Sequence, residues 1–178
     1  MAMKTTRRAA LVAFLILAVF LARGLFLRSP KPRPLPLPQP GANIRLCSRV
    51  IDGDTIICEG VGKIRLIGIN APELGAFGGD TSAQFLENLI LRKQVKVEVC
   101  PVNPTDRYRR TRAIIYLPSP TGDKNVNQYL VSQGYAEVSP LLPCHVDANQ
   151  WRPLQEEARR NKRGLYALSP NPFARRPQ

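Results

Sequence analysis

The chain has 178 residues, 44% of them hydrophobic, which suits one globular domain, and its 26 Lys and Arg against 13 Asp and Glu give a net charge of +13. Residues 1–46 hold eight of the bases and no acid, so the remainder, with 18 bases and 13 acids, has a net charge of only +5, which suits a phosphate-bearing partner without requiring one. The four cysteines include no Cys-x-x-Cys pair and His145 is the single histidine, which argues against a zinc site and leaves buried thiols or disulfides.

Residues 1–28 have the pattern of a membrane segment. Three bases within residues 4–8 precede an unbroken apolar run at 9–22, and a second short run at 25–27 follows Arg23. Cleavage after Ala22 would need a small residue where Phe20 stands. We therefore predict an uncleaved anchor that holds the domain outside the cytoplasm. A cleaved signal peptide, giving a secreted protein, and an organellar targeting peptide are the alternatives.

Residues 29–42 form a Pro-rich segment with six prolines at every second position from 30 to 40. Prolines at this spacing are incompatible with a helix or the interior of a sheet, and they favour an extended polyproline conformation. Residues 29–41 would then span about 40 Å. We predict a spacer between membrane and domain, with a Pro-rich ligand for a partner protein as the alternative.

Residues 43–168 are predicted to fold as one domain. Alternating apolar residues and the turn signals Asp52-Gly53 and Gly60–Gly62 predict strands at 44–51, 55–58, 63–69, 94–99 and 112–117. Apolar spacing and the glycines at 134 and 164 predict helices at 82–92, 126–133 and 150–162. We expect a mainly β, α+β fold, a small closed barrel with helices against it, followed by a loose basic tail at 169–178.

Two short motifs place polar side chains at neighbouring strand ends. Asp54 begins the second predicted strand, and Asn70 and Glu73 follow the third. Their oxygens would form a hard site suited to Ca²⁺. Arg65, inside the third strand, is costly there unless its guanidinium meets an anion. Taken alone, Asp52-Gly53-Asp54 is only a turn, and the Arg-rich run at 107–112 only a solvated loop.

The order of these motifs resembles the staphylococcal nuclease (thermonuclease) family. The matching segments are Ile51-Asp52-Gly53-Asp54-Thr55, Arg65-Leu66 with Asn70-Ala71-Pro72-Glu73, Thr105-Asp106-Arg107-Tyr108-x-Arg110, and the helix segment from Val126-Asn127 to Tyr135-Ala136. The resemblance covers residues 44–168. It implies an OB-type barrel of five strands with three helices, a fold that commonly presents a groove for single-stranded nucleic acid.

The resemblance also implies a role for each matching residue. Asp54 and Asn70 would bind Ca²⁺ through their side chains, and Ala71 through its backbone carbonyl. Glu73 would be the general base, or would orient the attacking water.

Three arginines and a tyrosine complete the implied site. Arg65 and Arg110 would hold the phosphate and neutralise the charge that builds on it in the transition state. Tyr108 and Arg109 would lie near the bound nucleotide.

The chain departs from the family pattern at three places. Asn70 stands where the family usually has an acid, which should weaken Ca²⁺ binding. Arg109 stands where the family usually has Gly, so the local backbone must differ or tolerate a side chain. The segment 74–81 is short compared with the mobile loop of the family's best-known member, which bears on substrate affinity.

The cysteines suggest two disulfides. Cys47 and Cys58 flank the Asp52-Gly53 turn on neighbouring predicted strands, although such pairs often strain a bridge. The regions of Cys100 and Cys144 lie close together in the family fold, which implies a bridge between them.

These observations favour a monomeric Ca²⁺-dependent nuclease acting on DNA, RNA or both. A non-catalytic OB-type binding module with a decayed metal site is the main alternative, and an adaptor that uses the Pro-rich segment is a third. The presence of Glu73 together with Arg65 and Arg110 argues against decay, because a binding surface needs no base.

Overall fold

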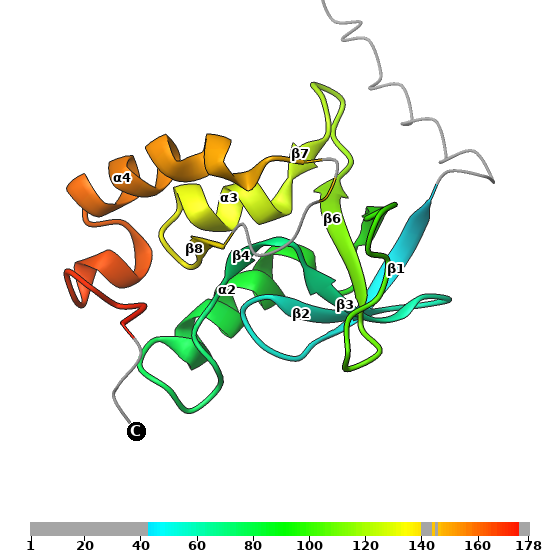
Figure 1. Ribbon diagram of the computed structural model, residues 1–178, viewed down its shortest axis with the longest axis horizontal. Coiled ribbons are helices and arrows are strands. Elements are labelled where there is room, and N and C mark those ends of the chain that lie inside the picture. Colours follow the sequence, from blue (N-terminus) through cyan, green and yellow to red (C-terminus); the bar gives the residue numbers. More distant parts are fainter. Residues whose placement is uncertain (1–42, 140–143, 145, 175–178) are drawn as a thin grey trace, which may run out of the picture. The chain divides into compact units, whose positions relative to one another are not determined.

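The computed structural model describes residues 43–139, 144 and 146–174 (Figure 1). The predicted anchor and the predicted Pro-rich spacer lie outside these residues. Within the described part of the chain, no helix combines the length and apolar character needed to cross a membrane.

Five strands close into a barrel: β1 Ile44–Val50, β2 Thr55–Cys58, β3 Gly62–Leu66, β5 Gln94–Val99 and β6 Thr111–Leu117. β1 pairs antiparallel with β2 and β5, and further antiparallel pairings join β2 to β3 and β5 to β6. A parallel pairing of β3 with β6 closes the ring. Alternate residues point inward, as Val95 and Val97 do on β5, and fill the interior with aliphatic side chains. The predicted OB-type barrel is therefore confirmed.

The prediction of one continuous strand at 63–69 is wrong. The chain leaves the barrel after Leu66, and β4 Gly68–Asn70 pairs instead with β8 Glu137–Ser139, which was not predicted. Gly68 has a φ of +77°, and a Cβ atom there would lie 2.7 Å from the Cβ of Ala148. The break therefore needs glycine for its backbone conformation and for close packing. It sends Asn70 out of the barrel toward β8.

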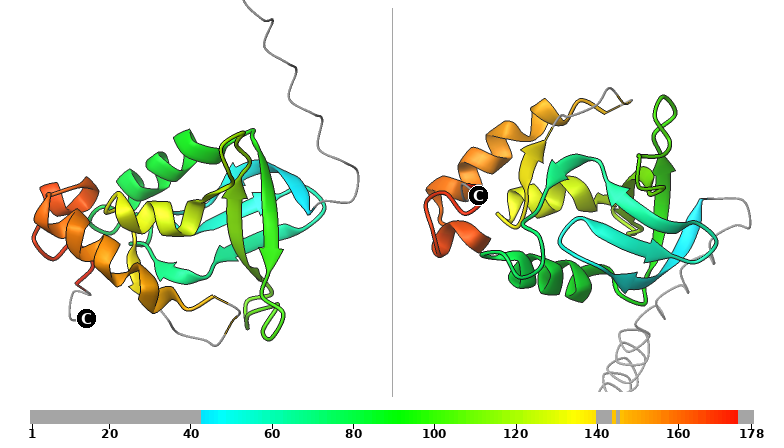
Figure 2. Two further views of the ribbon diagram at one scale, coloured as in Figure 1. Left: turned by 90° about the horizontal axis from the view of Figure 1, so that it is seen from above. Right: turned by 60° about the horizontal axis from the view of Figure 1, so that its bottom comes forward.

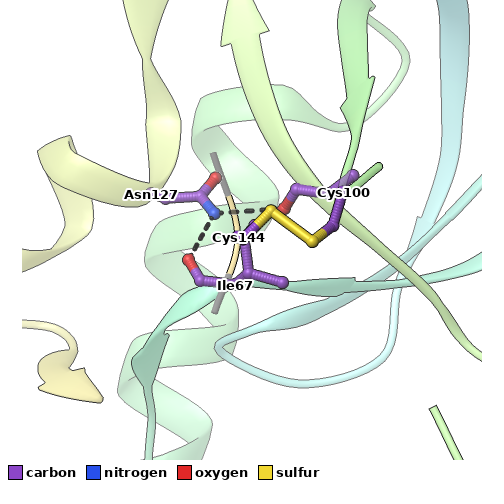
Figure 3. Close-up of a disulfide and its surroundings, with 5 residues drawn as sticks. Ile67, Cys100, Asn127 and Cys144 are labelled. Atoms are coloured by element: carbon purple, nitrogen blue, oxygen red, sulfur yellow. Dashed lines mark hydrogen bonds between the residues drawn. A yellow bond between two sulfur atoms is a disulfide. The ribbon is translucent and has the colours of Figure 1, made fainter. Parts of the chain in front are cut away.

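A buried asparagine holds this break in place (Figure 3). Nδ2 of Asn127 donates to the carbonyls of Ile67 at 2.9 Å and Ala113 at 3.2 Å, and its Oδ1 accepts from the amide of Ile115 at 3.1 Å. The side chain is fully buried. It thus satisfies backbone groups that the interrupted strand would otherwise leave without partners.

Three α-helices cover the barrel, as predicted: α2 Gly79–Ile90, α3 Val126–Ser132 and α4 Arg152–Arg160. The smaller elements are the strand β7 Lys124–Asn125 and the 3-10 helices η1 Ala148–Trp151 and η2 Gly164–Ala167. α3 packs on β6 and on α4, while α2 packs against β1. Figure 2 shows η2 at the end of the domain opposite the turn between β2 and β3.

The predicted helix boundaries shift by a few residues. α2 begins three residues before the predicted start of 82, and α4 is confined to 152–160 instead of 150–162. The shorter α4 has Pro153 in its first turn and follows η1, in which the Asn149 amide donates to the side chain of Asp147. The start of the predicted tail packs against the domain, since the Phe173 ring lies edge-on to Tyr166 at 5.6 Å.

Of the two predicted disulfides, the one between Cys100 and Cys144 is present, with their Cα atoms 5.7 Å apart. Cys47 and Cys58 are instead free, buried thiols, so a second bridge is wrong. They face each other across β1 and β2, but β1 changes register between Cys47 and Arg49. The Cys47 and Cys58 side chains are joined by a hydrogen bond, and the Cys47 thiol also lies 3.8 Å from the Arg49 carbonyl oxygen. A bridge between paired positions on neighbouring strands is often strained, which favours the two free thiols.

Loss of the disulfide should lower stability. The bridge closes a loop spanning 44 residues, so the chain-entropy estimate predicts that Cys144→Ser destabilises the fold by about 3–4 kcal/mol. Guanidinium unfolding of both proteins, with and without reductant, measures this. Reductant should shift the midpoint of the wild type and leave that of Cys144→Ser unchanged. An unchanged wild-type midpoint would contradict the prediction.

Candidate active site

The start of β2 and the end of β4 meet at Asp54. Its carboxylate, in a residue only 6% exposed, accepts the Ala71 amide at 2.8 Å and pairs with Nη2 of Arg65 at 3.0 Å. Gly53 permits this approach, because a Cβ atom there would lie 2.6 Å from the Cβ of Ala71 and 2.7 Å from that of Ser82. The Asp52–Asp54 turn is therefore part of a packed site as well as a chain reversal.

Arg65 connects the barrel to the segment that leaves it. Its Nη1 donates to the carbonyls of Leu66 and Ile69, and its Nη2 donates to Oδ1 of Asn70 at 3.3 Å. One guanidinium nitrogen therefore contacts side-chain oxygens of both Asp54 and Asn70. Burial lowers the pKa of Arg65, and the neighbouring Asp54 charge opposes that shift. The predicted cost of an arginine in this strand is offset by hydrogen bonds along its whole fork.

The Asp54 carboxyl has an elevated pKa of about 6. Burial is the main cause, while the Arg65 charge and the Ala71 amide act in the opposite direction. Asp54 is consequently ionised at neutral pH and becomes protonated in mildly acidic solution.

Asn70 is oriented from two sides. Its Oδ1 accepts from Arg65, and its Nδ2 donates to Oε1 of Glu137 on β8 at 3.5 Å. The amide oxygen is thereby directed toward the Asp54 side of the site. Glu137 also brings a second carboxylate close to this position.

A second arginine reaches the same strand end from the β5–β6 loop. Nε of Arg110 donates to Asp106 at 2.8 Å, and its Nη1 donates to Oγ1 of Thr55 at 3.2 Å. Asp106 also accepts the amides of Tyr108 and Arg110, both at 2.9 Å. Burial disfavours ionisation of Asp106, but these hydrogen bonds with Arg110 prevail and hold its pKa below the usual value.

The two residues before Arg110 lie on the surface. Tyr108 is 62% exposed, and its ring lies 5.3 Å from the Arg110 guanidinium and 4.8 Å from that of Arg107. Arg109 adopts a left-handed conformation with φ +63°, so the backbone tolerates a side chain at an estimated cost of about 1–2 kcal/mol. The Arg109 side chain points to solvent and belongs to the edge of the site.

Glu73 lies in the loop of residues 71–78 between β4 and α2. Its backbone carbonyl accepts from Ala76 at 3.0 Å, and a Cβ on Gly79 would come within 1.9 Å of that oxygen, so the loop requires glycine at 79. The side chain is exposed, and its charge acts on Arg65. Among the described residues the Glu73 carboxylate has no hydrogen bond or ion pair, so it is free to bind a water.

The predicted metal ligands form an oxygen-only set with few charges. The described residues contain no cluster of three His, Cys, Asp or Glu side chains suited to a metal ion. Asp54 and Asn70 do converge, since both side chains contact the same nitrogen of Arg65. Carboxylate, amide and carbonyl oxygens fit Ca²⁺, which takes six to eight oxygen ligands and accepts waters among them.

Two hollows flank this cluster. A cavity of about 390 Å³ is lined by Arg65 and Arg110 and extends to the disulfide and η1. A second, larger hollow of about 860 Å³ contains Asn70, Ala71 and Glu73 and is bordered by the 71–78 loop and Phe173. Arg65 and Arg110 therefore line one hollow, and Asn70, Ala71 and Glu73 line the other.

Residues 63–167 match the family described as "Staphylococcal nuclease homologue". The chain belongs to the staphylococcal nuclease family. It is 34% identical over 127 residues to a "Micrococcal nuclease" of Shigella flexneri, covering 67% of this chain and 71% of that protein. It is 37% identical over 128 residues to an "Uncharacterized endonuclease" of Escherichia coli O157:H7, and 29% identical over 129 residues to the "Thermonuclease" of Staphylococcus hyicus. These matches cover 67% of this chain in both cases, and 74% and 73% of the relatives. The protein is therefore a nuclease, a phosphodiester hydrolase.

Several residues of the nuclease site were not assigned a role from the sequence: Thr55, Asp106, Asn127 and Glu137. Asp106 accepts hydrogen bonds from the amides of Tyr108 and Arg110, two and four residues further along the chain. An aspartate that binds nearby amides in this way is a local turn signal, so its role could have been predicted from the sequence. The contacts of Thr55, Asn127 and Glu137 join segments 55 or more residues apart, or depend on the unpredicted β8, and leave no local pattern.

Proposed function

We propose that this nuclease hydrolyses phosphodiester bonds of DNA, RNA or both with Ca²⁺ as its cofactor. The observation that carries the proposal is the contact of one Arg65 nitrogen with Asp54 and Asn70, beside the exposed carboxylate of Glu73. Asp54, Asn70 and the Ala71 carbonyl would hold the ion. When bound, Ca²⁺ would neutralise charge on the phosphate and polarise it toward attack.

The side chains divide the remaining work by their positions. Glu73 has no competing partner among the described residues and can take a proton from a water that attacks phosphorus. Arg65 and Arg110 present planar donors to the phosphate oxygens, whose charge increases in the five-coordinate transition state. Hydrogen bonds to Asp106 and Thr55 fix the orientation of the Arg110 guanidinium before substrate binds. Less side-chain entropy is therefore lost on binding.

A non-catalytic OB-type binding module is the competing function. It would explain the arginines but not an acid that is kept exposed and unpaired beside them.

The disulfide between Cys100 and Cys144 supports an oxidising compartment outside the cytoplasm. Anchoring of the nuclease by residues 1–28, or its secretion after cleavage, belongs to the same proposal, as does action as a monomer.

Digestion of plasmid DNA and of RNA by the full chain tests the function. Cleavage with added Ca²⁺ that stops with chelator and returns on restoring Ca²⁺ is the expected result. Binding of both substrates without cleavage, at any Ca²⁺ concentration, would favour the binding module. Cleavage at an unchanged rate in the presence of chelator would contradict the proposed dependence on Ca²⁺.

Asn70→Asp should lower the Ca²⁺ concentration needed for half-maximal activity. The change adds one negative charge to the ligand set, at a side chain that already faces Arg65 and Asp54. Glu137 already contributes negative charge near this position, because its carboxylate lies 3.5 Å from the Asn70 amide nitrogen. Asn70→Asp combined with Glu137→Gln removes that charge again and should therefore shift the requirement less than Asn70→Asp alone. A Ca²⁺ titration of activity in both variants measures it, and no shift in Asn70→Asp would remove Asn70 from the ligand set.

A further inference from the structure

Arg112 lies directly beside the phosphate-binding arginines without having been assigned a role. It pairs in register with Arg65 across the parallel β3–β6 ladder, so both side chains leave the barrel on the same face. The neighbours of Arg112 along β6 alternate accordingly, since Ala113 points inward and is fully buried. Arg65, Arg110 and Arg112 all line the 390 Å³ cavity.

The charges around the three arginines are not balanced in the same way. Arg65 is paired with Asp54 and Arg110 with Asp106. The half-buried Arg112 side chain has no hydrogen bond or ion pair with any described residue. The other acid lining the cavity, Asp147, uses its carboxylate to accept from Asn149. A cation placed opposite a second cation on adjacent strands is destabilising, so this position has a cost that substrate contact can offset.

The rest of the cavity suits a flat, partly apolar group. Ile67, Ile114, Val146 and Trp151 line it beyond Arg112, and its volume falls in the range of pockets that enclose small organic ligands. A second phosphate would gain nothing from these apolar walls. A nucleobase would place its faces against them and its polar edge at the guanidinium.

We propose that Arg112 is a specificity-determining residue that reads a base next to the scissile phosphate, with guanine preferred. This inference rests on the proposed function. The two parallel donors of a guanidinium match the O6 and N7 acceptors of guanine, whereas adenine presents a donor at the corresponding exocyclic position. The strand would enter with its phosphate between Arg65 and Arg110 and its adjoining base in the cavity.

The test uses single-stranded DNA oligonucleotides that are identical except for the base on each side of one bond, digested by the full chain. The wild type should cleave fastest beside guanine. Arg112→Met keeps the apolar stem and should lose about 5- to 150-fold at that site, with little loss elsewhere. Arg112→Lys should lose the preference too, because an ammonium lacks the fork. Arg49→Met removes the same charge from an exposed position on β1, outside the cavity lining, and should keep the wild-type preference.

The outcomes separate this inference from the proposed function. A wild type that cleaves with no base preference, or with one that Arg112→Met retains, overturns the base-reading role alone. A second contrary outcome is an Arg112→Met variant that slows all sequences equally and reduces the slope of log rate against log salt by about 0.7, the value for one lost phosphate contact. Arg112 then binds phosphate, which also overturns the base-reading role. A wild type that cleaves no oligonucleotide overturns the proposed function.

Discussion

Glu73→Gln is expected to lower kcat by about 10²-fold or more while leaving the fold and nucleotide binding nearly unchanged. A carboxamide has nearly the shape of a carboxylate but cannot accept the proton of the attacking water, and general-base catalysis typically contributes 10²–10⁴-fold. The side chain is exposed and makes no bond within the described residues, so no structural contact is lost.

Single-turnover cleavage and binding of a nucleotide analogue separate the two effects. Glu156→Gln is a matched control, because Glu156 is an exposed acid on α4 away from both hollows. It should retain wild-type rates. Full activity of Glu73→Gln would exclude Glu73 as the base and strengthen the case for a different proton acceptor at this site.

The barrel could be predicted because its signals are local. Residue alternation in Gln94–Val99 and the Asp52-Gly53 turn each specify structure within a few residues. The break after Leu66 could not be predicted, because Gly68 adopts its conformation against Ala148 and Trp151, which are about eighty positions further along the chain. A three-residue strand such as β8 has too few residues to show a period.

The site shows the same division. Asp54, Arg65 and Asn70 were expected together, and they are joined by hydrogen bonds and an ion pair. The sequence did not indicate that Arg65 would also donate to the backbone carbonyls of Leu66, at the end of β3, and Ile69, in β4. The register shift in β1 beside Cys47 likewise left no sign in the sequence, because such a shift changes no residue type.

Arg65→Lys is expected to lower kcat/KM by about 10²–10³-fold, although it conserves charge. Loss of one preorganised donor to a developing oxyanion has this magnitude, and a lysine ammonium cannot reproduce a planar fork. A single ammonium also cannot reach Asp54, Asn70 and the Leu66 and Ile69 carbonyls together. An additional loss of stability of about 1–3 kcal/mol is expected from the carbonyl or carboxylate left without a partner.

Denaturant unfolding and steady-state kinetics on the same samples distinguish these losses. Arg163→Lys is the control, since Arg163 pairs with Glu157 at 2.8 Å on a more exposed surface, where such a change costs little. If Arg65 acts on the transition state, kcat should fall in Arg65→Lys even where the protein is fully folded, and a conformational role alone would leave the kcat of the folded fraction unchanged. Because the same fork orients Asn70, the Ca²⁺ requirement of Arg65→Lys should rise as well, whereas that of Arg163→Lys should not.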